Sequence, residues 1–154
     1  MCIRDRGKTE DAIHGWSQAI ASNPTFAHAY NNRAAAYVKT LKYEDGFKDY
    51  RKAIELEPTF ARAHDNFAWA LATCSDDQLR DAVAATKHAD AACKLTQHNN
   101  WKYLSTLAAA NAEADKFDAA VRWIGKAIEL APETQTESLN SLKEMYEAGQ
   151  KLGN

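Results

Sequence analysis

The side chains that most often carry out chemistry are scattered along this sequence. The five histidines are His14, His28, His64, His88 and His98, and the three cysteines are Cys2, Cys74 and Cys93. His88 and Cys93 lack the i, i+3 or i+4 spacing that places two metal ligands on one face of a helix. The adjacent carboxylates Asp76 and Asp77 fall in a polar stretch that is typical of a solvated turn. The sequence therefore predicts neither a metal site nor an acid–base pair.

Motifs for phosphate binding or nucleophilic catalysis are also missing from the sequence. It contains no GxGxxG, GxxxxGK[ST] or GxSxG pattern. The cysteine count is odd and no CxxC pair occurs, which favours buried structural thiols in a reducing compartment and hence a cytoplasmic protein. We predict that the chain is not an enzyme and that it uses no cofactor.

Composition points to an ordinary globular chain. The 154 residues are the length of one domain, and hydrophobic residues make up 45% of them, enough for a packed core. The formal net charge of −2 gives no reason to expect nucleic acid or a membrane surface as a partner. No apolar run approaches the roughly 18 residues of a membrane span, and Met1–Arg6 lacks the apolar stretch of a secretory signal.

Since no catalytic group stands out, the pattern of elements becomes the main evidence, and Ala27–Phe60 shows it most clearly. Its first half places Tyr30, Arg33, Ala34 and Tyr37 at i, i+3, i+4 and i+7, which is one helical face. Its second half forms another such face from Phe47, Tyr50, Ala53 and Ile54. Pro58 then ends the second helix, because proline cannot continue it. A hairpin of two short helices cannot bury its own apolar faces, so it needs neighbours.

The neighbours appear as a period in the sequence. Pro24 and Pro58 lie 34 residues apart, and Pro132 follows after 74, which is two such periods and an insertion of 6. A repeat of about 34 residues has the length of the tetratricopeptide repeat. Ala27–Phe60 resembles that family in Tyr30, Ala34, Tyr37, Tyr43, Tyr50, Ala53, Leu56 and Pro58. Trp101–Pro132 resembles it in Leu104, Leu107, Ala108, Phe117, Ala120, Ile124, Ala127 and Leu130.

This resemblance implies an all-α fold, a right-handed α-solenoid of antiparallel helix pairs with a C-terminal capping helix. The run Thr106–Ala114 is similar to bacterial members of the family. We expect one domain over 1–154, divided into a partial repeat (7–26), a repeat (27–60), a repeat with an enlarged loop (61–100), a repeat (101–134) and a capping helix (135–149). Helices are predicted near 9–22, 27–40, 43–56, 61–73, 81–96, 101–114, 117–131 and 136–148. Ser75 or Asp76 is a candidate to start a turn in the loop, Asp81 to cap the next helix, and Gly149 to end the last one.

The first residues do not fit the repeat. Met1–Arg6 resembles a translated adapter, so we expect it to be non-native and the chain to be a fragment that begins inside a repeat. Counting back from Pro24 places Gly7 at the turn between two helices. Ile13 and Trp16 are then predicted to be more exposed than their counterparts Phe47 and Tyr50, and the exposed patch favours self-association through this end.

In the resembled family the first helix of each repeat lines a concave face, which can hold a peptide. The predicted peptide-binding residues are Asn32, Lys39, Arg62, Asn66, Trp69 and Lys102, and Asn31 is expected to line the same face. Amides can bond to an extended backbone, cations can hold a carboxylate, and tryptophan supplies apolar contact. The three cations come from three consecutive first helices, which favours an acidic partner segment. The alternative is a face that is merely solvated.

The function predicted from this resemblance is a non-catalytic protein–protein interaction scaffold. One alternative is a regulatory or spacer module of a larger enzyme. Another is a chaperone adaptor, because some family members clamp a C-terminal carboxylate with five side chains. Asn32 matches the middle asparagine of that clamp and Arg62 one cation, whereas Asn66 stands where a second cation belongs, so the clamp would be degenerate. The upstream sequence would distinguish these alternatives.

Overall fold

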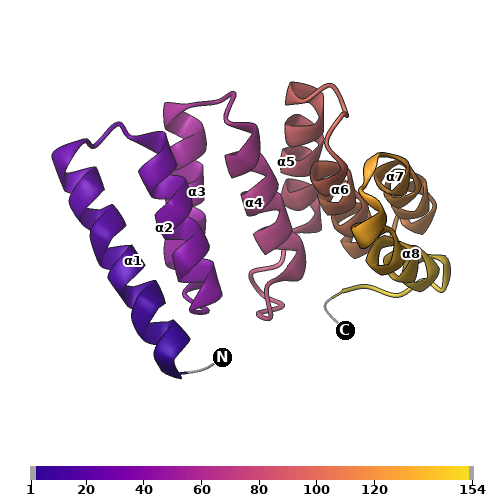
Figure 1. Ribbon diagram of the computed structural model, residues 1–154, viewed down its shortest axis with the longest axis horizontal. Helices are drawn as coiled ribbons and strands as arrows, with labels where there is room; N and C mark the ends of the chain where they lie inside the picture. Colours follow the sequence, from indigo (N-terminus) through magenta and orange to yellow (C-terminus); the bar gives the residue numbers. More distant parts are fainter. Residues whose placement is uncertain (1–2, 153–154) are drawn as a thin grey trace. The chain divides into compact units, whose positions relative to one another are not determined.

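The computed structural model describes residues 3–152, which form α-helices joined by short turns (Figure 1). The helices are α1 (Ile3–Ser22), α2 (Ala27–Lys39), α3 (Tyr43–Leu56), α4 (Ala61–Thr73), α5 (Ala82–Leu95), α6 (Trp101–Glu113), α7 (Phe117–Leu130) and α8 (Glu133–Glu147). No strand occurs within these described residues. The all-α class and the helical-repeat architecture predicted from the sequence are confirmed.

The contacts divide the chain into two compact units, residues 1–66 and 67–154, with the boundary inside α4. In the first unit, α1 packs on α2 and α2 packs on α3. In the second unit, α5, α6, α7 and α8 pack in the same consecutive way. The single-domain organisation over 1–154 and its repeat boundaries stay predictions.

Most helix ends lie within two residues of the predicted positions, and some of them are fixed by local capping groups. The carboxylate of Asp81 accepts a hydrogen bond from the Ala84 amide at 2.9 Å and caps α5, as predicted. Asp76 likewise accepts from the Gln78 amide at 3.0 Å and starts a turn in the enlarged loop. Gly149 follows α8 with φ +70°, the left-handed conformation that glycine adopts without a steric penalty.

Two helix starts were predicted wrongly. α1 begins at Ile3 and continues through Gly7, where a turn was expected. A glycine costs a helix only about 1 kcal/mol relative to alanine, and no proline interrupts this stretch. α8 begins at Glu133 rather than near 136, because Pro132 has φ −65° and leads directly into a helix. The expectation that 1–6 are non-native stays untested, and residues 1–2 lie outside the described residues.

The core of the first unit is built from small residues and a few rings. Ala27, Ala53, Phe60 and Ala63 form one buried cluster, against which Tyr30, Ile54 and Leu56 pack. At Gly46 an added Cβ would lie 2.9 Å from Val38 Cγ2 and 3.1 Å from the Ala34 carbonyl oxygen. α2 and α3 therefore approach so closely at this point that a side chain at residue 46 would force one of them to move.

A buried ion pair joins α2 to α3, and its arginine also bonds to α1. Arg33 of α2 donates from Nε and Nη2 to Asp49 of α3 at 2.6 and 2.9 Å, and from Nη1 to Ser17 of α1 at 3.1 Å. Asp49 is 5% exposed. The guanidinium carbon also lies 5.7 Å from the centres of the Tyr30 and Tyr37 rings. The hydrogen bond to the Asp49 carboxylate raises the pKa of Arg33, which therefore remains charged.

The predicted difference in exposure at the first helix is confirmed. Ile13 and Trp16 of α1 are half-buried, whereas Phe47 and Tyr50, which lie 34 residues later in α3, are 4% and 2% exposed. The two α3 side chains are covered because α3 packs on α2. Part of the apolar face of α1 is thus open to solvent.

In the second unit, alanine lets neighbouring helices approach one another. Ala108 of α6 and Ala120 and Ala127 of α7 are all fully buried, and these two helices pack together. The enlarged loop is fixed to α6 by Arg80, whose guanidinium lies 3.3 Å from Glu113 and also pairs with Asp77. The loop is therefore an ordered part of this unit.

Candidate functional site

Two of the predicted peptide-binding residues are joined by a third asparagine. The Asn66 side-chain nitrogen donates to Asn31 Oδ1 at 3.0 Å, and Asn31 Nδ2 donates to Asn32 Oδ1 at 3.1 Å. Asn31 is 1% exposed, whereas Asn32 and Asn66 are half-buried. The three amides form a chain of hydrogen bonds from the middle of α4 to α2.

This chain of hydrogen bonds corrects the expectation for Asn31 and specifies the hydrogen-bonding roles of Asn32 and Asn66. Asn31 was expected to line an open face, but its burial makes it a structural bridge, since a buried amide must be hydrogen-bonded. Among the described residues nothing accepts from the Asn32 amide nitrogen or donates to the Asn66 side-chain oxygen. Asn32 therefore offers hydrogen-bond donors and Asn66 offers an acceptor, and the bridge sets these orientations.

The two predicted cations of the first unit, Lys39 and Arg62, are both exposed. The Arg62 guanidinium lies 5.5 Å from the centre of the Phe60 ring. Phe60 in turn stacks on His28 with ring centres 4.2 Å apart. No ion pair engages Lys39 or Arg62 among the described residues, so both positive charges are available to an anion.

The other two predicted residues belong to the second unit. Trp69 is 42% exposed although it is a large aromatic side chain. Lys102 is exposed, and its Nζ lies 5.6 Å from the centre of the Trp101 ring. Each is thus accessible within its own unit. That Lys39, Arg62 and Lys102 together form one positively charged stripe stays a prediction.

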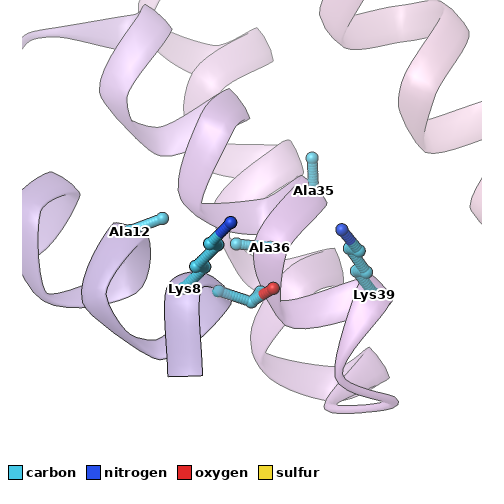
Figure 2. A pocket seen from close by; sticks show the side chains of 6 residues that line it. Lys8, Ala12, Ala35, Ala36 and Lys39 are labelled. Atoms are coloured by element: carbon cyan, nitrogen blue, oxygen red, sulfur yellow. The ribbon is translucent and has the colours of Figure 1, made fainter. Parts of the chain in front are cut away.

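Sequence reasoning missed Lys8, which lines a pocket together with Lys39. The pocket has a volume of about 350 Å³ and lies between α1 and α2. Its lining residues are Lys8, Thr9, Ala12, Ala35, Ala36 and Lys39. Figure 2 shows the two ammonium groups near Ala35 and Ala36. Because a turn was expected at Gly7 and a helix only from about residue 9, Lys8 was not recognised as part of a helix face.

Other kinds of site find little support in the part of the chain that the structure describes. No group of three His, Cys, Asp or Glu side chains there converges on a point that could hold a metal ion. Cys74 and Cys93 are buried free thiols, as predicted, and burial raises the pKa of Cys74. None of the described helices combines the length and the apolar character that a membrane crossing requires.

Comparisons with known proteins agree with the repeat geometry. The family model for the TPR repeat matches residues 3–40, which cover α1 and α2. The family model for the tetratricopeptide repeat matches residues 27–60, which cover α2 and α3. No curated protein matches the chain. Residues 3–60 therefore consist of tetratricopeptide repeats, and repeats of this family generally mediate protein–protein interaction.

Proposed function

We propose that this chain is a non-catalytic scaffold that binds a peptide or partner segment along the first helices of its repeats. The observation that carries the proposal is the amide chain, because buried Asn31 orients Asn32 as a donor and Asn66 as an acceptor. A polypeptide backbone presents one acceptor and, except at proline, one donor per residue. The Asn32 donor and the Asn66 acceptor can bond to these backbone groups. Such binding does not require a particular side chain on the peptide.

Charge gives the proposal a preference for acidic segments. Lys39 and Arg62, on the two helices that hold the amides, form no ion pair with any residue that the structure describes, and Lys102 is exposed in the second unit. Exposed cations attract an acidic segment and bind it less tightly as salt rises. The proposed binding residues are therefore Asn32, Lys39, Arg62, Asn66, Trp69 and Lys102, with Trp69 as the apolar contact.

The test is a peptide library screened against the parent chain and a Trp69→Ala, Arg62→Ala double variant. Acidic peptides should bind the parent and lose affinity in the variant, because removing an aromatic anchor typically costs about 2 kcal/mol or more. A Val83→Ala variant is the control, since Val83 is an apolar residue that is 80% exposed outside the proposed site. Equal binding by the parent and the double variant, or preferential capture of basic peptides, would overturn the site.

We further propose that two copies of the chain associate through α1. A pocket of about 350 Å³ on this helix is lined by Ala12, Gly15, Trp16 and Ala19. Residues 34 positions later, Gly46, Asp49, Tyr50 and Ala53, are all buried, and their helix packs on α2. By analogy, the four pocket residues of α1 form a surface on which another helix can pack. The α1 helix of a second copy can be that helix.

Light scattering tests this association. The parent should show a concentration-dependent dimer, and Trp16→Ser should shift it to monomer, because the largest apolar side chain of the patch is lost. Val83→Ser is a matched control, since it removes an exposed apolar side chain elsewhere. A parent chain that stays monomeric at high concentration would refute association through α1.

A further inference from the structure

The pocket between α1 and α2 has a composition that selects for negative charge. Two of its lining residues are the lysines Lys8 and Lys39, and none of the lining residues that the structure describes is acidic. Neither ammonium group has an ion pair or hydrogen bond with the described side chains. α1 also carries Glu10 and Asp11, but these do not line the pocket. Among the described side chains, no carboxylate therefore compensates the two positive charges that face this pocket.

Apart from Thr9, the remaining walls of the pocket suit a short aliphatic group. Ala12, Ala35 and Ala36 present methyl groups, and Figure 2 shows Ala36 between the two lysine side chains. The pocket is much larger than a single water molecule, whose share of liquid volume is about 30 Å³. It can therefore hold a charged group together with the methylenes that carry it.

We propose that this pocket binds a carboxylate group of the partner peptide, held between the ammonium groups of Lys8 and Lys39. Lysine binds an anion as a compact point charge with rotatable donors, so it accepts a carboxylate without a fixed orientation. The proposal rests on the proposed peptide-binding function and adds Lys8, on the helix before α2, to the residues that recognise the partner. The carboxylate can come from an acidic side chain or from the end of a chain.

Three peptides separate these two sources. Acetyl-tetraglutamate amide has side-chain carboxylates alone, acetyl-Gly-Ser-Gly-Ser with a free C-terminus has an end carboxylate alone, and the amidated form of the latter has neither. Their affinities are measured by calorimetry at low salt for the parent and for Lys8→Met and Lys39→Met. At least one carboxylate peptide should bind, the amidated neutral peptide should not, and each substitution should weaken binding by up to about five-fold.

Matched variants distinguish a specific pocket from general attraction. Lys8→Arg keeps the charge and should keep the affinity, whereas Lys42→Met removes an exposed charge that does not line this pocket and should have no effect. If the substitutions at residues 8, 39 and 42 weaken binding equally, the pocket is not a specific site. If acidic peptides bind the parent and depend on Arg62 and Trp69 but not on Lys8, the carboxylate pocket is wrong and the proposed function survives. If neither of the two carboxylate peptides binds the parent, both are wrong.

Discussion

Replacing Asp49 by alanine is expected to lower the free energy of unfolding by about 3–5 kcal/mol, the usual loss when one partner of a buried ion pair is removed. Asp49 accepts two hydrogen bonds from Arg33 at 2.6 and 2.9 Å, and its side chain is 7% exposed. Without the carboxylate, the guanidinium would stay between the helices, and Ser17 would be its one remaining hydrogen-bond partner among the described residues. Urea unfolding followed by circular dichroism measures the loss.

Two further variants show whether the buried charge is the cause. Asp45→Ala removes an exposed carboxylate from the same helix and should cost less than about 1 kcal/mol. A double substitution of Arg33 and Asp49 by leucine should recover much of the stability, because apolar replacement of a whole buried pair is often nearly neutral. A loss below about 1 kcal/mol for Asp49→Ala would show that the pair does not hold the first unit together.

The second large effect is expected at Ala108, where leucine should destabilise the chain by about 1–3 kcal/mol or more through overpacking. Ala108 is fully buried in α6, which packs on α7, and the facing helix also presents fully buried alanines. Three additional carbon atoms cannot fit there unless the two helices separate. Calorimetry measures the melting temperature of the variant against that of the parent.

Val83→Leu is the control for this substitution, since Val83 is 80% exposed in the same unit and tolerates extra volume. Its melting temperature should match that of the parent. If Ala108→Leu also melted within a degree of the parent, the close approach of α6 and α7 would be misassigned. The two alanines of α7 would then need another explanation for their burial.

Helical spacing and the proline period were enough to predict most of the fold. They located α3 (Tyr43–Leu56) and α4 (Ala61–Thr73) without error, and Pro58 marks the break between these two helices. They failed at Gly7, where a weak helix breaker was taken as a turn. They also placed the start of α8 too late, because Pro132 was taken to be followed by a loop rather than by the helix itself.

The candidate site was less predictable, because its geometry depends on residues far apart in sequence. Asn66 and Asn31 bond across 35 positions, and no local pattern indicates that Asn31 would turn inward as a bridge. The pairing of Arg33 with Asp49 across 16 positions was likewise missed. Exposed cations such as Lys39 were easier to identify, since the repeat does not use their positions for packing.

Backbone amide chemical shifts, recorded while an acidic peptide is added to the isotope-labelled chain, test the proposed binding face most directly. The account predicts that the largest changes fall on the first helices, at Asn32, Lys39, Arg62, Asn66, Trp69 and Lys102. A basic peptide of equal length should produce none of them. Changes confined to the second helices α3, α5 and α7, or no change with any acidic peptide, would contradict the proposal that this repeat protein binds its partner through these residues.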